Sequence, residues 1–284
     1  MPGTPSRWIH EMSFNEIEAH LKKDDVALVP IGATEQHGHH APMMLDTAWA
    51  ISASEAAAEI ADVLIAPPLH YGWSSTHMDF AGAITFSADT LRAATEDICM
   101  SLLWHGFQRI IIVNGNRIAN LPPLDIAAVR VRNRTGAFVG VADCGLIAQE
   151  EIMEISEGGT GCNGHAGESE TSMILHRFPE FTDMKKVVDG MKSNIKPRKK
   201  GSKELLHGHV NLDPRLRGDS VYIPTLPSEL RAMTRTTRGV RGKAAAATAA
   251  KGEKMVKAIG ANITAFITKA RKTKVNLRNV EYPV

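Results

Sequence analysis

The feature that most limits the fold of this chain is a series of short apolar runs separated by stretches with helical spacing. The runs are Val26–Ile31, Val63–Pro68, Arg109–Val113 and Ala137–Ala142. Helical patterns precede or separate them at Ser13–Lys23, Thr47–Asp62, Thr90–Phe107 and Pro122–Asn133. Continuous apolar runs of this length predict strands that are buried on both faces. Their alternation with helices predicts an α/β fold with a mostly parallel central sheet and helices on both sides.

The length and composition fit one large domain. With 284 residues, of which 43% are hydrophobic, the chain can bury an extensive core. No shift in composition marks a boundary, so we expect a single α/β domain over residues 1–284. A C-terminal helix or helix pair is predicted over Gly242–Lys272, with a break near Gly260.

The charge balance and the cysteine content limit which binding partners and which cellular compartment we expect. The 33 basic and 31 acidic residues nearly cancel, which argues against nucleic-acid and membrane partners. The basic stretch Lys196–Lys203 lacks interleaved aromatic residues and is interpreted as an exposed loop. Three widely spaced cysteines without a CxxC pair are typical of a reducing compartment. We find no signal-peptide pattern and no apolar run of ~18 residues, so we expect a cytoplasmic protein.

Polar side chains are concentrated after the predicted strands. The first strand is followed by Glu35-Gln36-His37-Gly38-His39-His40 and then by Asp46. Residues 35 and 37 lie two apart, so in extended backbone both side chains leave the same face and can bind one ion. Further polar segments are His70–His77, Asn114–Asn120 and Gly164–Ser172. Because the carboxyl ends of parallel strands share one edge of a sheet, these segments together predict a metal site there.

Three of these segments resemble the motifs of the creatininase family of metal-dependent amidohydrolases. Pro30–Thr47 is similar to the family pattern P-x-G-[AS]-x-E-Q-H-G-x-H-x-P-x-x-x-D-T. Tyr71–Thr85 is similar to Y-G-x-S-x-x-H-x-x-F-x-G-T-I-[ST], with Ala83 at the usual threonine. His165–Ser172 matches H-A-G-E-x-E-T-S without a change. A weaker similarity is Gly239–Gly242, where the family carries a glycine motif before its last helix.

The resemblance implies a three-layer αβα sandwich with a two-metal centre of zinc or manganese. It also implies a small-molecule substrate and a homo-oligomer, often a hexamer. By the family pattern, Glu35 and His37 would each bind one metal and Asp46 would bridge both. Glu168 would complete the ligand set of one metal.

Catalytic and substrate contacts are implied for the second and last motifs. His165 would shuttle a proton near the scissile bond, with Glu170 as a supporting acid. His77 would contact the substrate or support the catalytic groups. Trp73 is a candidate wall of a pocket for a small ring.

The third motif departs from the family pattern N-G-H-G-G-N. The chain reads Asn-Gly-Asn-Arg-Ile-Ala-Asn at Asn114–Asn120, so Asn116 replaces a metal-binding histidine. Three arrangements are open: Asn116 binds through its amide oxygen, His39 or His40 substitutes, or a single metal is held. An amide oxygen is a weaker ligand than imidazole, so we expect one firmly held divalent ion and a weaker second site.

Arg117 stands where the family has glycine, and two interpretations of it are open. It can pair with a local acid such as Asp125, because structural ion pairs are common. It can instead bind an oxygen of the substrate through its planar guanidinium. His39 and His40 are also predicted to lie near the substrate.

These residues predict a metal-dependent hydrolase that opens a small polar ring, with metal-bound water attacking a carbonyl. The residue at position 116 argues against creatinine itself. An alternative is hydrolytic C–C cleavage of a cyclic keto-polyol such as an oxidised inositol, since a metal that polarises a carbonyl also stabilises an enolate. A hypothesis from another class is a non-catalytic descendant that binds a metabolite or a protein partner.

Overall fold

One parallel sheet forms the centre of the molecule. The computed structural model describes residues 6–117, 119–158, 164–190 and 224–283. Within these ranges the strands are β1 (Val26–Ile31), β2 (Leu64–Ile65), β3 (Arg109–Asn114) and β4 (Phe138–Asp143). They pair in the order β2-β1-β3-β4, and every pairing is parallel.

The first four α-helices of the described residues alternate with the strands as predicted, and four more follow the last strand. They are α1 (Phe14–Leu21), α2 (Leu45–Ala61), α3 (Ala88–Trp104), α4 (Leu121–Thr135), α5 (Gln149–Ile155), α6 (Glu168–Arg177), α7 (Pro227–Met233) and α8 (Ala249–Arg271). Single 3-10 turns are η1 (Ile9–Glu11), η2 (Ser75–His77), η4 (Pro179–Phe181), η5 (Met184–Lys186) and η7 (Ala244–Ala246). No helix in these ranges is both long and apolar enough to cross a bilayer.

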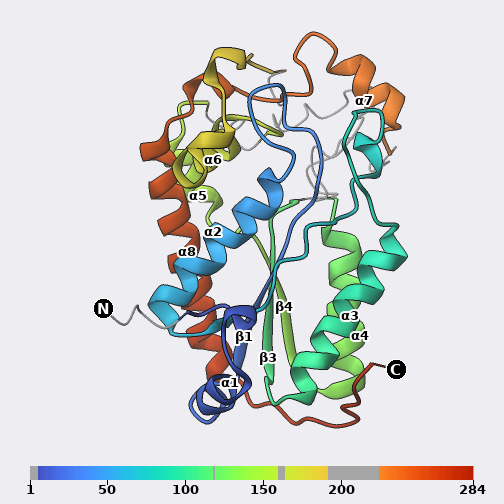
Figure 1. Ribbon diagram of the computed structural model, residues 1–284, viewed down its shortest axis with the longest axis vertical. Helices are drawn as coiled ribbons and strands as arrows, with labels where there is room; N and C mark the ends of the chain where they lie inside the picture. Colours follow the sequence, from blue (N-terminus) through green and yellow to red (C-terminus); the bar gives the residue numbers. More distant parts are fainter. Residues whose placement is uncertain (1–5, 118, 159–163, 191–223, 284) are drawn as a thin grey trace, which may run out of the picture.

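Helices cover both faces of the sheet, which confirms the predicted αβα sandwich (Figure 1). Alternate residues of each strand point to opposite faces. Leu28 and Ile111 pack in a cluster with residues of α2, α6 and α8. Val29 and Ile112 pack on the other face with residues of α3 and α4. Between their end residues the strands are apolar, because helices cover both faces of the sheet.

The edge strand β2 is shorter than the apolar run Val63–Pro68 predicts. Only Leu64 and Ile65 pair with β1. The run continues into Pro67 and Pro68, which have no N–H for the hydrogen-bond ladder. The prolines therefore end the strand.

The C-terminal helix α8 is continuous, so the predicted break near Gly260 is wrong. Gly260 lies where α8 packs against α2, and a Cβ there would lie 2.6 Å from Ala56 Cβ. The glycine allows the two helices to approach closely without breaking α8. The stretch Lys196–Lys203 lies outside the described residues.

The strand order reverses between β1 and β3, and this position is where α/β sheets commonly bind ligands. The backbone just after both strands touches the N-terminal turn of α2. A Cβ on Gly115 would lie 1.9 Å from the carbonyl oxygen of Asp46, and one on Gly32 would lie 2.3 Å from Thr47 N. Two glycines thus bring α2 directly against the end of the sheet.

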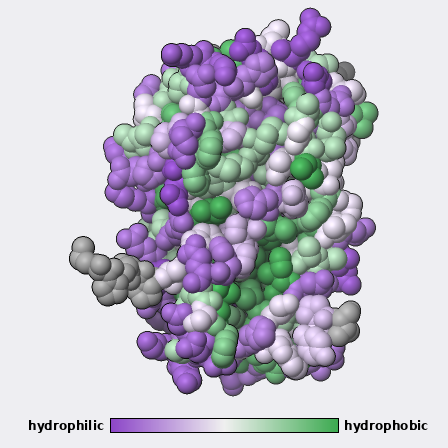
Figure 2. Space-filling model, in the orientation of Figure 1, coloured by the Kyte–Doolittle hydropathy of each residue, from purple (hydrophilic) through white to green (hydrophobic). Residues whose placement is uncertain are grey.

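The surface is not uniformly polar. On the face shown in Figure 2, hydrophobic residues gather in the lower part of the molecule, where Figure 1 shows α1 and α3. Phe14 of α1 and Trp104 of α3 are among the exposed large hydrophobic side chains. The homo-oligomer implied by the family resemblance stays a prediction.

Candidate metal centre

The segment after β1 places two of the predicted ligands against the first turn of α2. Glu35 and His37 are both buried, as is Asp46, the second residue of α2. His37 Nδ1 lies 3.1 Å from the carbonyl oxygen of Glu35, and His37 Nε2 lies 3.2 Å from Asp46 Oδ1. The backbone contact orients the imidazole so that its other nitrogen faces the carboxylate.

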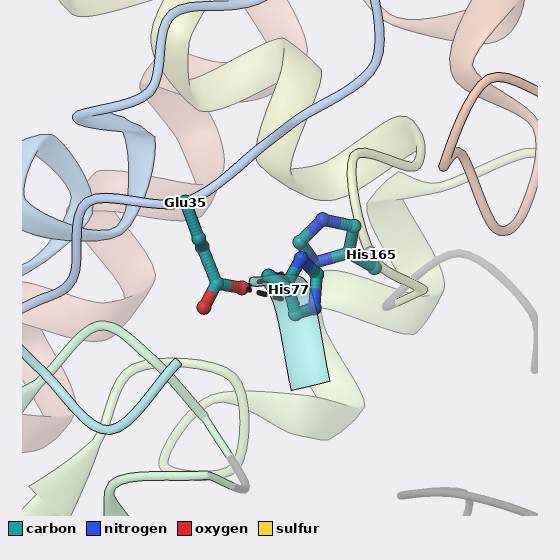
Figure 3. Close-up of side chains that lie close together, drawn as sticks. All are labelled: Glu35, His77 and His165. Carbon is teal, nitrogen blue, oxygen red and sulfur yellow. Dashed lines mark ion pairs between the residues drawn. The ribbon is translucent and has the colours of Figure 1, made fainter. Parts of the chain in front are cut away.

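Two further histidines reach Glu35 from distant parts of the chain (Figure 3). His77 ends the η2 turn, and His165 precedes α6. Glu35 Oε1 lies 3.5 Å from His77 Nε2 and 3.6 Å from His165 Nδ1. The His165 ring also stacks on His37, with ring centroids 4.4 Å apart.

Glu170 approaches the same group from α6. Its Oε2 lies 3.9 Å from His37 Nε2 and accepts a 2.6 Å hydrogen bond from the backbone N–H of Ala166. Ala166 has a φ of 52°, in the left-handed region that a non-glycine residue rarely adopts. This local strain sits between His165 and Glu170 and helps to turn both side chains toward His37.

These side chains form one cluster, which we call the metal cluster. Its members are Glu35, His37, Asp46, His77, His165 and Glu170. The cluster contains three overlapping groups whose ligand atoms lie within 4.8 Å of one another. All six residues are among those predicted for the site.

The carboxyl groups of the metal cluster have raised pKa values. Burial raises the pKa of Asp46 well above its ordinary value, and the charges of Glu35 and Asp143 add to the shift. Burial likewise raises the pKa of Glu170 to about 8, although His37 lowers it in part. The pKa of Glu35 is also raised by burial. Crowded buried acids of this kind are unfavourable as anions unless a cation compensates them.

Two histidines of the cluster, His77 and His165, are held neutral. Burial lowers the pKa of His77 to about 3, and His37 and Arg241 add to the effect. Burial also lowers the pKa of His165 well below its ordinary value, with further lowering by His37 and His77. Neutral imidazoles are the form that binds metals and accepts protons.

The residues fit a divalent cation. Asp46 Oδ2 is buried and has no hydrogen-bond partner among the described residues. A buried carboxylate oxygen without a partner is costly, and a bound metal would satisfy it. Neutral histidines beside carboxylates form the donor set that zinc and manganese accept.

Glu168, predicted as a metal ligand, lies outside the metal cluster. Its two oxygens accept hydrogen bonds from the backbone N–H groups of Glu157 and Gly158, at 2.9 and 2.7 Å. Lys251 Nζ of α8 lies 2.7 Å from its Oε1. These contacts tie the start of α6 to α8, and Glu170 is the acid of this motif that lies beside His37.

The two unusual residues of the third motif lie at different places. Asn116 donates a 3.0 Å hydrogen bond from Nδ2 to Glu35 Oε2, so it holds a carboxylate of the cluster. Arg117 lies beside Gly145, and its charge lowers the pKa of Asp143. Burial nevertheless raises the pKa of Asp143 to about 7. This position favours the interpretation of Arg117 as the partner of a local acid.

The remaining predicted substrate contacts lie apart from the cluster. His40 is buried, and its Nε2 lies 2.9 Å from Thr171 Oγ1 of α6. His39 is exposed to solvent. Trp73 packs against the core cluster beneath α3 and α4. None of the three belongs to the groups of the metal cluster, and their contact with a substrate stays a prediction.

Gln36 is central to the site although the sequence analysis does not predict it. Its Nε2 lies 2.9 Å from His165 Nε2 and 3.4 Å from His77 Nδ1. Its Oε1 accepts a 2.9 Å hydrogen bond from the N–H of Gly38. The position of Gln36 between two predicted ligands is the signal that could have identified it.

Comparisons with known proteins agree with this geometry. A family model described as creatininase, creatinine amidohydrolase, matches residues 10–267. Creatinine amidohydrolase of Pseudomonas putida is 28% identical over 212 residues, which cover 68% of this chain and 80% of that protein. A mycofactocin precursor peptide peptidase of Mycobacterium ulcerans is 35% identical over 162 residues, covering 54% of this chain and 58% of that protein. A 3-dehydro-scyllo-inosose hydrolase of Thermotoga maritima is 26% identical over 218 residues, covering 73% and 70%.

Solved structures show the same fold. A crystal structure of creatinine amidohydrolase has a TM-score of 0.72 at 25% identity and covers 95% of this chain and 100% of that chain. A zinc form of a creatininase mutant has a TM-score of 0.71 at 25% identity, with the same coverage. The family match spans most of the sequence, and the fold agrees with it over nearly the whole chain. This chain therefore belongs to the creatininase family of hydrolases.

Proposed function

We propose that this protein is a metal-dependent hydrolase that opens a C–N bond in a small polar cyclic substrate other than creatinine. The observation that carries the proposal is the buried metal cluster at the switch point of the sheet. It joins acids and neutral imidazoles from the segments after β1, near η2 and before α6. A cluster with a purely structural role would have little reason to keep the carboxylate oxygen Asp46 Oδ2 without a hydrogen-bond partner among the described residues.

Each residue has a separate task in this proposal. Glu35, His37 and Asp46 would hold the cation, with Glu170 beside His37. A bound divalent ion polarises a carbonyl and lowers the pKa of water toward neutrality. Asn116 and Gln36 would keep the neighbouring side chains in place through the contacts described above.

His165 would move the proton. Because its imidazole is neutral, it can accept a proton from the attacking water and return it to the leaving nitrogen. His77 lies against His165, with ring centroids 4.6 Å apart, and would help to orient it.

A second candidate is hydrolytic cleavage of a C–C bond in a cyclic ketone. The similarity to the Thermotoga maritima hydrolase over 73% of this chain supports it. Asn116 in place of histidine also makes the cluster differ from the family pattern. The same metal and proton carrier would serve both reactions, because each begins with attack on a carbonyl.

A substrate screen with a matched pair of variants tests the proposal. Purified protein would be loaded with zinc or manganese and assayed against cyclic amides, short peptides and cyclic ketones. We expect turnover of a cyclic amide, reduced by about 10²–10⁴-fold in His165→Asn with the metal retained. The exposed His105 provides the control, and His105→Asn should keep full activity.

The outcomes separate the alternatives. Turnover confined to cyclic ketones would favour the second candidate. Ligand binding without turnover, unchanged in His165→Asn, would favour a non-catalytic descendant and refute the hydrolase.

A further inference from the structure

The loop between α7 and α8 lies against the metal cluster. Figure 1 shows this part of the chain crossing the top of the molecule, near α6. The backbone N–H of Arg241 donates a 2.7 Å hydrogen bond to the carbonyl oxygen of His165. Gly239 packs against the Gln36 side chain so closely that a Cβ would lie 2.0 Å from Gln36 Oε1. The segment from Gly239 to Arg241 is therefore held beside Gln36 and His165.

The positive charge of the Arg241 side chain acts on His77 and His165. The side chain is partly buried, and its positive charge lowers the pKa of both His77 and His165. Burial also lowers the pKa of Arg241 itself, and no acid among the described residues offsets that shift. The backbone contact with His165 and these effects on both imidazoles place the positive charge of Arg241 in the neighbourhood of His77 and His165.

Arg241 differs from other arginines in this protein. Arg109, Arg177 and Arg271 each pair with an aspartate or a glutamate. Among the described residues, no acid forms an ion pair with the Arg241 side chain. A partly buried guanidinium without an opposite charge is unfavourable, so its position suggests that a ligand supplies the anion.

We infer that Arg241 binds an anionic group of the substrate, and that this group is a carboxylate next to the scissile carbonyl. The inference rests on the proposed function, since it places the reacting carbonyl beside His165. The planar guanidinium can bind both oxygens of a carboxylate. The substrate class then narrows to small cyclic amides or short peptide-like amides that carry a carboxylate. A neutral ring would leave the charge of Arg241 without a partner.

Binding to matched pairs of compounds tests this assignment. Each pair differs only in a carboxylate: dihydroorotate and dihydrouracil, hydantoin-5-acetate and hydantoin, and N-acetylglycine and N-acetylglycinamide. Dissociation constants would be measured by calorimetry with zinc-loaded full-length protein. In at least one pair we expect the carboxylate compound to bind about tenfold tighter or more.

Substitutions of Arg241 test whether this residue causes the preference for the carboxylate compound. We expect Arg241→Gln to abolish the preference and Arg241→Lys to restore part of it, with zinc content and circular dichroism unchanged. The exposed Arg235 lies on the same segment, and Arg235→Gln should keep the full preference. Zinc content also shows whether a variant has lost the site altogether.

Three results would overturn the inference. They are equal binding within every pair, no measurable binding of any carboxylate compound, and a preference that survives in Arg241→Gln. The last result would assign the carboxylate to the metal. The hydrolase proposal is tested separately, because turnover and the effect of His165→Asn are measured independently of this binding preference.

Discussion

At the scale of single residues, Asp46 and Asn116 decide how the cluster can hold a cation. Asp46 offers a buried oxygen without a hydrogen-bond partner among the described residues. Asn116 uses its amide nitrogen to bind Glu35, at a position where the family pattern has a histidine ligand. The cluster therefore has one well-formed ligand set around Asp46 and a weaker side near Asn116.

This asymmetry predicts the metal content. We expect about one tightly held divalent ion per chain in the unmodified protein and almost none in Asp46→Ala, because the substitution removes a ligand between Glu35 and His37. Asn116→His should raise the content toward two. Elemental analysis after chelator-free purification measures each value. Unmodified protein that is fully folded and free of metal would contradict the prediction.

At the scale of secondary-structure elements, α6 shows how helix geometry selects among candidate ligands. Glu168 and Glu170 are two residues apart, so on a helix their side chains point about 200° apart. One can face the metal cluster only if the other faces away. Packing of α6 against α8 turns Glu168 toward Lys251 and Glu170 toward His37.

The contact between α8 and α2 yields a stability prediction. Gly260→Ala should lower the free energy of unfolding by about 1–2 kcal/mol, because overpacking at Ala56 outweighs the better helix propensity of alanine. Lys254 lies on the exposed side of the same helix, and Lys254→Ala should change stability by less than about 0.5 kcal/mol. Urea unfolding measures both. A stabilised Gly260→Ala variant would show that α2 and α8 are not in close contact at this position.

At the scale of the whole molecule, the buried titratable groups couple stability to pH. The pKa of His77 is lowered to about 3 in the folded protein. Below pH 6.5 the unfolded state therefore binds a proton that the folded state does not, and the free energy of unfolding falls as pH is lowered. Above pH 6.5 this histidine is neutral in both states, so the buried acids determine how stability changes with pH. Glu170 has a pKa of about 8 in the folded protein against an ordinary value of 4.5, so the folded state holds a proton that the unfolded state has lost. The contribution of Glu170 to stability therefore falls as pH rises from about 4.5 to about 8.

The pH dependence of stability should be stronger after the metal is removed. In chelator-treated protein we expect the free energy of unfolding to fall by about 1 kcal/mol per pH unit between pH 6.5 and 8. In zinc-loaded protein the fall should be smaller or reversed, because metal binding favours the deprotonated acids. Urea denaturation at three pH values, with and without zinc, measures the difference. Parallel profiles for the two forms would argue that no cation binds among these acids.

Much of the architecture follows from sequence patterns alone. The apolar runs locate β1, β3 and β4 to within a residue, because strands buried on both faces must be continuously hydrophobic. The capping box at Ser13 and Glu16 marks the start of α1, where the N–H of Ser13 donates to the Glu16 carboxylate at 2.8 Å. The motifs also contain all six residues of the metal cluster.

Local periodicity and spacing in the sequence identify the long strands β1, β3 and β4, the helices α1 to α4 and the polar residues that follow the strands. Three features come from the folded arrangement instead: α8 stays unbroken at Gly260, Glu170 rather than Glu168 lies beside His37, and the backbone of Arg241 contacts His165. Those outcomes depend on contacts between segments far apart in the chain. The direction of a side chain within such contacts is set by packing, and a linear pattern does not encode it.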